Sequence, residues 1–180
     1  RHPASSVPPT RRGTYLGVRL AATRMWREFH LLARARDLGL PVPEPVAARC
    51  VRTSPATYRG DLLTRWVPES RTLTSRLAEG PLPPEAWHAI GRVLRRFHDA
   101  GVFHADLNAD NVLLDEAGNV HLLDFDKGRL RPPAAAWRDA MLARLRRSLE
   151  KKRAALAGFA YDDARDWPRL LAGLRGESAG

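Results

Sequence analysis

Three polar residues in the middle of the chain have the types and spacing that phosphoryl transfer requires. Asp106 and Asn111 lie in the segment His104–Asn111, and Asp124 follows Asn111 by thirteen residues. In transfer from ATP, one carboxylate accepts a hydrogen bond from the acceptor hydroxyl group. An amide oxygen and a second carboxylate hold the Mg²⁺ ions that bridge the phosphates. Asp106, Asn111 and Asp124 supply this set and predict an ATP-dependent kinase.

The segments around these residues predict how the side chains meet. Two short apolar runs, 112–115 and 120–123, flank Glu116–Asn119, whose composition is typical of a hairpin turn. Folding this hairpin brings the residue before the first strand next to the residue after the second. We therefore expect Asn111 and Asp124 at one end of the hairpin, where a metal ion can bridge them.

The alternative is that Asp106 and Asn111 are loop residues that make turn hydrogen bonds, and that Asp124 is a polar strand end. A single Asp-x-x-x-x-Asn pattern would favour this alternative. The combination of the loop, the hairpin and the segment Asp124-Phe125-Asp126 favours the kinase instead.

The pattern departs from the protein-kinase form at two positions. Ala105 stands where protein kinases have Arg, and Asp126 stands where they have Gly. The missing Arg is the usual partner of an activation-loop phosphate. Its absence indicates a constitutive kinase for a small molecule or a lipid, not a switched protein kinase.

These residues give the chain a family resemblance. It resembles the lipopolysaccharide core kinases and, among them, the kinases of 3-deoxy-D-manno-octulosonic acid (Kdo). The catalytic-loop motif alone indicates only a kinase, whereas its combination with Leu-Pro-Val-Pro and Asp-Phe-Asp-Lys-Gly-Arg is more specific. The resemblance extends over about residues 26–149, and the segments that carry it are 38–49, 58–64, 104–115, 123–130 and 140–149.

The resemblance implies a protein-kinase-like α+β fold with a mostly helical C-terminal lobe, and it implies ATP and Mg²⁺ as cofactors. Asp106 would be the catalytic base, and Asn111 and Asp124 would be the Mg²⁺ ligands. Glu28 would be the helix acid that pairs with a basic side chain over the ATP phosphates. His104 would brace the catalytic loop and the segment Asp124-Phe125-Asp126.

The resemblance also implies a substrate and a location. The acceptor would be a Kdo sugar on a lipid A precursor, and the enzyme would lie peripherally on the cytoplasmic face of the bacterial inner membrane. Other kinases with the same catalytic residues, of the heptose or aminoglycoside type, remain an alternative. A truncated, non-catalytic pseudokinase that binds a lipid or a partner is a further one.

The segment 64–68 is expected to form the hinge between the lobes, where backbone groups can pair with the adenine edge. Thr64, Trp66 and Val67 are the candidate nucleotide-binding residues of this hinge. Trp66 has an equally good alternative as a core or surface aromatic residue.

The N-terminal region lacks a glycine-rich phosphate-covering loop, because Gly13 and Gly17 do not have the required spacing. We therefore expect that the first strands of an N-terminal lobe are missing. The expected division is a partial N-terminal lobe at residues 1–66 and a C-terminal catalytic lobe at residues 67–180. If no cation covers the phosphates, nucleotide binding should be weak.

Composition limits the partners. The net charge of +10 and the pI near 11.0 indicate an anionic partner, although a coding bias toward Arg is a simpler explanation. ATP and an anionic membrane surface both fit. No aromatic stacking platform or groove-reading motif is recognisable, so we expect no nucleic acid. The sequence contains no run of 18 apolar residues and only one cysteine, which excludes an internal disulfide.

Helical periodicity predicts helices at about 21–38, 84–100 and 134–156, with a short one after Asp162. Strands are expected at 46–51 and 58–64. The helix 134–156 combines an apolar stripe with many basic residues. The stripe either packs on the lobe core, which we favour, or inserts partly into anionic lipid.

Overall fold

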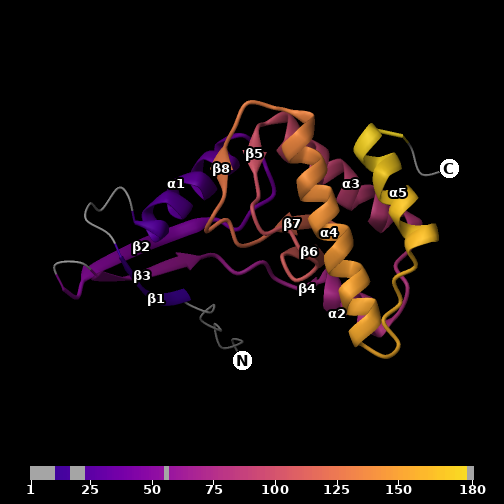
Figure 1. Ribbon diagram of the computed structural model, residues 1–180, viewed down its shortest axis with the longest axis horizontal. Coiled ribbons are helices and arrows are strands. Elements are labelled where there is room, and N and C mark those ends of the chain that lie inside the picture. The colour runs from indigo at the N-terminus through magenta and orange to yellow at the C-terminus, as the bar shows by residue number, and fades with distance from the viewer. Residues whose placement is uncertain (1–10, 17–22, 55–56, 178–180) are drawn as a thin grey trace, which may run out of the picture.

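The computed structural model describes residues 11–16, 23–54 and 57–177 (Figure 1). Helices and small antiparallel sheets alternate along the chain, which confirms the expected α+β class. The elements are β1 (Arg11–Leu16), α1 (Arg24–Asp37), β2 (Pro45–Arg52), β3 (Thr57–Thr64), β4 (Ser70–Thr72), α2 (Leu73–Glu79), α3 (Pro84–Asp99), β5 (Val102–Phe103), β6 (Val112–Asp115), β7 (Val120–Leu122), β8 (Arg129–Leu130), α4 (Ala135–Ala155) and α5 (Asp163–Arg175).

The N-terminal part is a sheet with one helix beside it. Its three strands pair in the order β1-β3-β2, all antiparallel, and α1 packs against β2 (Figure 1). The predicted strands at 46–51 and 58–64 are confirmed as β2 and β3. Strand β1, which precedes α1 and pairs with β3, was not predicted. Gly17 lies outside the described residues.

Helix α1 has one buried side that faces the rest of the molecule. Met25, Leu32 and Ala35 are each at most 3% exposed. The helix ends where predicted, because Gly39 adopts a left-handed backbone with φ 69° and prolines follow it. The predicted start at Ala21 lies outside the described residues.

The helical part is built around α3. Its predicted apolar stripe, Trp87, Ile90, Leu94 and Phe97, is fully buried. Helix α5 packs along α3 (Figure 1), and glycines on both helices let the backbones approach closely. A Cβ atom added at Gly91 would lie 2.1 Å from the carbonyl oxygen of Leu170.

Helix α4 buries its apolar stripe against the same core. Trp137, Met141, Leu145 and Leu149 are all at most 8% exposed. The stripe therefore packs on the lobe, and its insertion into lipid is excluded in this fold. The basic residues of α4 lie around the stripe on the exposed sides of the helix.

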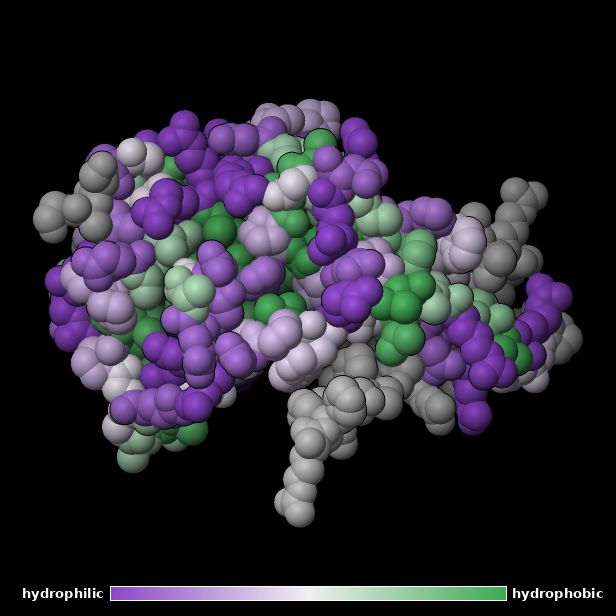
Figure 2. Space-filling view, turned by 180° about the vertical axis from the view of Figure 1, so that it is seen from behind, coloured by the Kyte–Doolittle hydropathy of each residue, from purple (hydrophilic) through white to green (hydrophobic). Residues whose placement is uncertain are grey.

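The surface of the described residues is mainly hydrophilic. Figure 2 shows hydrophobic residues only in small areas between hydrophilic ones on the face opposite to that in Figure 1. The large hydrophobic residues that are exposed are scattered over several elements: Leu38, Val46, Val51, Trp66, Leu130 and Leu156. Within the described ranges, no helix has the length and apolar character needed to cross a bilayer.

Candidate active site

The predicted hairpin brings two of the candidate residues together. Strands β6 and β7 pair with Val112 opposite Leu122, and the backbone N–H of Leu123 donates to the carbonyl of Asn111 at 2.9 Å. Asp124 directly follows Leu123, so it lies close to Asn111. Asp124 has a left-handed backbone with φ 65°, a conformation that non-glycine residues adopt mainly at functional sites.

Hydrogen bonds to one carbonyl fix the catalytic loop. The side-chain amides of Asn111 and Asn108 both donate to the backbone oxygen of Asp106, at 3.0 and 2.9 Å. Asn108 also accepts from the backbone N–H of Asp110 at 2.9 Å. These are the turn bonds that the simple loop alternative predicts. They also orient the Asn111 amide, so that its Oδ1 is the oxygen left for another partner.

His104 connects the catalytic loop to the strand that precedes Asp124. Its Nδ1 accepts from the N–H of Asp106 at 3.2 Å, so Nε2 is the nitrogen that donates to the Leu123 carbonyl at 2.7 Å. The ring is 1% exposed and lies 4.6 Å from the ring of Phe125. Burial lowers the pKa of His104 and keeps it neutral. This geometry agrees with the bracing role expected of it.

The sequence did not predict the partner of the Asp106 carboxylate. Arg144 of α4 donates to Oδ1 of Asp106 from Nε at 2.9 Å and also from Nη2. This ion pair lowers the pKa of Asp106, so the group is a carboxylate at neutral pH. Arg144 lies in the segment 140–149 that carries the resemblance, and this was the one available signal for it.

Two further residues on the same face of α4 hold the loop. The hydroxyl oxygen of Ser148 accepts from the N–H of Ala109 at 3.1 Å, and Lys152 forms an ion pair with Asp110 at 2.8 Å. Residues four apart lie on one face of a helix, so α4 presents Arg144, Ser148 and Lys152 to the catalytic loop as a row.

Helix α1 reaches the segment after Asp124. Arg24 forms an ion pair with Asp126, which stands where protein kinases have Gly. Glu28 is 4% exposed, so it is a buried helix carboxylate and not a solvated one. Glu28 therefore faces the interior between α1 and the rest of the molecule.

The three hinge candidates connect β3 to β4. Thr64 is the last residue of β3, and Trp66 is 52% exposed, so it is a surface residue in this structure. The Val67 carbonyl accepts from the hydroxyl of Ser70 at 2.7 Å. None of the three lines the cavity described next.

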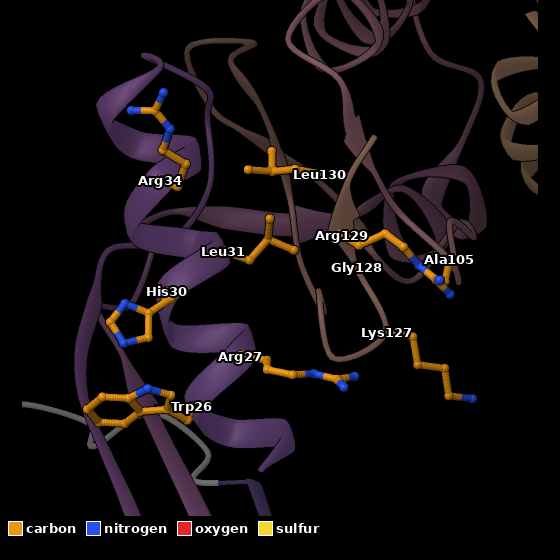
Figure 3. A pocket seen from close by; sticks show the side chains of 10 residues that line it. All are labelled: Trp26, Arg27, His30, Leu31, Arg34, Ala105, Lys127, Gly128, Arg129 and Leu130. Atoms are coloured by element: carbon orange, nitrogen blue, oxygen red, sulfur yellow. The ribbon is translucent and has the colours of Figure 1, made fainter. Parts of the chain in front are cut away.

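A cavity with a volume of about 710 Å³ lies between α1 and the segment 127–130 (Figure 3). Its lining includes Ala105, the residue immediately before Asp106. Five lining residues carry basic side chains: Arg27, His30, Arg34, Lys127 and Arg129. Sequence reasoning did not find this cavity, because its walls are about 100 residues apart in the chain.

The residues at the hairpin end fit Mg²⁺. Asn111 and Asp124 offer oxygen atoms, which this ion prefers, and it commonly binds to one or two protein groups together with substrate phosphates. The described residues contain no group of three His, Cys, Asp or Glu side chains that could hold a metal without a substrate. The donor set therefore suits an ion that arrives with a nucleotide.

Comparisons with known proteins identify the family of the chain. A family model described as "Lipopolysaccharide kinase (Kdo/WaaP) family" matches residues 12–173. The 3-deoxy-D-manno-octulosonic acid kinase of Actinobacillus succinogenes is 41% identical over 167 residues, which are 91% of this chain and 68% of that protein. The enzyme of the same name from Vibrio cholerae is 44% identical over 130 residues, 72% of this chain and 54% of that protein.

The chain thus spans between about half and two thirds of these curated relatives. Among solved structures, "WaaP in complex with acyl carrier protein" is similar, with a TM-score of 0.65 and 21% identity over 86% of this chain and 67% of that one. This similarity confirms the protein-kinase-like fold.

Proposed function

Since the chain belongs to the lipopolysaccharide kinase (Kdo/WaaP) family, we propose that it transfers the γ-phosphate of ATP to a hydroxyl group of a Kdo sugar on a lipid A precursor. One observation carries the proposal: the hairpin places Asn111 beside Asp124 while the Asn111 amide bonds to the backbone of Asp106. This adjacency supports the proposal, because phosphoryl transfer needs a base and two metal ligands close together.

Asp106 is the catalytic base in this proposal. Both contacts from Arg144 go to Oδ1, which leaves Oδ2 to accept a hydrogen bond from the acceptor hydroxyl. The lowered pKa keeps the carboxylate charged, so it orients the hydroxyl group and takes up its proton. The new P–O bond forms as the bond from the γ-phosphorus to the bridging oxygen breaks and ADP leaves. His104 holds the loop in position through its two hydrogen bonds.

Asn111 and Asp124 would hold Mg²⁺, which supplies neutralising charge to the ATP phosphates when it is bound. Glu28 would pair with the cation that covers these phosphates. The hinge residues Thr64, Trp66 and Val67 would contact the base. Because the Val67 carbonyl already accepts from Ser70, we assign its amide N–H to the adenine edge.

The substrate defines where the enzyme works. A Kdo-bearing lipid A precursor is an anionic lipid, and we propose that the chain meets it at the cytoplasmic face of the inner membrane as a peripheral protein. The net charge of +10 supports this assignment, because a basic surface is attracted to anionic lipids.

The test is transfer of labelled γ-phosphate from Mg-ATP to a Kdo-bearing lipid A precursor, with Asp106→Asn as the active-site variant. A general base contributes roughly 10²–10⁴-fold, so we expect a loss of kcat of that size. Asp139→Asn, which removes an exposed carboxylate of α4, is the matched control and should retain the activity.

Two results would contradict the proposal. One is equal transfer by the Asp106→Asn variant, which would remove Asp106 from the reaction. The other is no transfer by the unsubstituted chain under conditions where the Actinobacillus succinogenes enzyme is active. Thermal unfolding of each variant shows whether a lost activity reflects a lost fold.

A further inference from the structure

The cavity between α1 and the segment 127–130 has the chemistry of an anion-binding pocket next to the catalytic base. We propose that this cavity, here called the basic pocket, binds an anionic group of the acceptor, a sugar carboxylate or a phosphate, while the acceptor hydroxyl lies at Asp106. This inference rests on the proposed function and adds the residues that would recognise the acceptor.

The charged side chains of the basic pocket are all cationic, and a histidine accompanies them. Arg27, His30 and Arg34 come from α1, and Lys127 and Arg129 come from the segment after Asp126. All five side chains are exposed, and the lining contains no acidic residue. None of the five forms an ion pair with a residue in the described ranges. The mutual repulsion of the Arg and Lys side chains is therefore relieved best by an anion between the two walls.

The basic pocket opens beside Asp106. Ala105 forms part of its lining, and the charge of Lys127 reaches far enough to contribute to the lowered pKa of Asp106. In the close-up, Arg27 extends from α1 toward the segment that carries Lys127 and Gly128 (Figure 3). An anionic substituent held there leaves the rest of the acceptor within reach of the catalytic carboxylate.

The remaining lining suits a sugar. Trp26, Leu31 and Leu130 supply apolar surface, and Trp26 is held edge-on to His30 with ring centroids 4.7 Å apart. Aromatic rings commonly pack against the apolar C–H face of a ligand while polar groups around them set its orientation. The volume of about 710 Å³ is within the range of small-molecule sites.

At Gly128 the two walls of the basic pocket lie in close contact. A Cβ atom added there would lie 2.6 Å from Cδ2 of Leu31, so the two walls touch at this position. An anion bound above the contact would link α1, which carries Glu28, to the segment that follows Asp124. Acceptor binding would then also fix the position of α1 relative to the segment that follows Asp124, and both carry residues of the proposed nucleotide site.

The experiment compares Arg27→Gln and Lys127→Gln with a matched control, Arg36→Gln, in the full chain. Arg36 is an exposed arginine of the same helix that does not line the basic pocket. Losing one charge-assisted contact raises the KM for the Kdo-bearing lipid A precursor about tenfold in each pocket variant. This rise should be at least five times any change in the KM for ATP, and the control should keep both values.

A second acceptor identifies the anionic group. The same variants are assayed with the precursor after its lipid A phosphates have been removed enzymatically. A smaller effect on this acceptor assigns the pocket to phosphate, and an unchanged effect assigns it to the sugar carboxylate; both support the pocket.

Unchanged KM values for the acceptor in both pocket variants, with transfer intact, would overturn the inference and leave the proposed function standing. Equal increases in the KM for ATP and for the acceptor would also overturn it, because they would show a general loss of active-site structure. No transfer by the unsubstituted chain concerns the proposed function alone. In that case direct binding of the precursor to the chain and to Arg27→Gln, measured by calorimetry, decides the pocket, and equal affinity rejects it.

Discussion

The guanidinium group of Arg144 determines how the Asp106 carboxylate is presented. Two donors on one oxygen fix the orientation of the carboxylate and leave the second oxygen toward the substrate side. Arg144 does not need to touch the substrate for this effect, so it acts as a positioning residue. The ion pair is about half exposed to solvent, so its contribution to folding stability is small compared with its effect on geometry.

We expect Arg144→Gln to lower kcat about tenfold, because the carboxylate loses both its orientation and its neighbouring charge. Since Arg144 lowers the pKa of Asp106, its removal raises that pKa, and the acidic limb of the rate profile moves to higher pH. A pH series of kcat/KM measures the shift. Arg144→Lys should restore the charge and part of the rate. An unchanged acidic limb in the Gln variant would contradict the assignment.

His98 makes the stability of the fold depend on pH. The imidazole is 2% exposed, lies edge-on to Trp137 with ring centroids 5.6 Å apart, and has a buried Nε2 with no hydrogen-bond partner among the described residues. Burial, and then the charge of Arg138, lowers its pKa to about 4. The unfolded chain binds a proton near the ordinary pKa of about 6.5, so protonation favours unfolding.

The free energy of unfolding should therefore fall as pH drops from about 6.5 toward 4, by up to about 1.4 kcal/mol per pH unit for this residue. Above about pH 6.5 the contribution of His98 is constant. Urea unfolding at several pH values measures the slope, and His98→Gln should flatten it. An equal slope in the variant would assign the acid sensitivity to other groups, such as the buried His104.

At the scale of elements, the contact between α3 and α5 depends on two reciprocal glycines. A Cβ atom at Gly91 would meet the Leu170 carbonyl oxygen at 2.1 Å, and one at Gly173 would meet the His88 carbonyl oxygen at 2.2 Å. Both neighbours are backbone atoms, which cannot move without shifting a helix. The packing distance of the two helices is therefore set by the absence of side chains at these positions.

We expect Gly91→Ala to destabilise the fold by roughly 1–3 kcal/mol, since overpacking costs more than the better helix propensity of Ala returns. Thermal or urea unfolding measures the change. Gly80→Ala is the matched control, because nothing lies within 4 Å of an added Cβ there. A variant at Gly91 that is as stable as the control would show that the helices separate without loss.

The sequence predicted the elements that have a clear period or a local signal. The helices α1, α3 and α4 and the hairpin β6–β7 follow from apolar spacing and turn residues, and the adjacency of Asn111 and Asp124 follows from the hairpin. Strands β5 and β8 are only two residues long and have no period to detect. Their pairing depends on tertiary contacts.

The same distinction applies to the site. His104, Asp106 and Asn111 lie within one loop, so their relation is local and readable from spacing. Arg144 approaches Asp106 across 38 residues, and only the packing of α4 on the lobe brings them together. The basic pocket likewise needs α1 and the segment 127–130 to be placed side by side. Periodicity indicates which side of a helix is buried, but it does not indicate which loop the exposed side will meet.

At the scale of the whole molecule, α4 carries two kinds of basic residue, those that form ion pairs and those that do not. Arg144, Arg146 and Lys152 pair with carboxylates of other elements. Three more basic residues of this helix are exposed and form no ion pair within the described ranges: Arg147, Lys151 and Arg153. With the apolar stripe buried, α4 can approach an anionic membrane only through such charges, at the level of the headgroups.

We expect the chain to bind vesicles that contain anionic phospholipid and not to bind neutral vesicles. Each basic group near such a surface contributes about 1 kcal/mol, and salt screens this attraction as the Debye length falls from about 10 Å at 0.1 M to about 3 Å at 1 M. Vesicle sedimentation over a salt series measures the binding. Replacing Arg147, Lys151 and Arg153 with Gln should weaken it at least tenfold at 0.1 M salt.

The matched control replaces Arg36, Arg59 and Arg92 with Gln, which removes the same charge from α1, β3 and α3. If α4 is the face that meets the membrane, this control keeps most of the binding. If both triple variants lose binding equally, the attraction follows net charge alone and no face is preferred. Binding that persists at 1 M salt would contradict the electrostatic explanation, because only apolar contact with the lipid survives such screening.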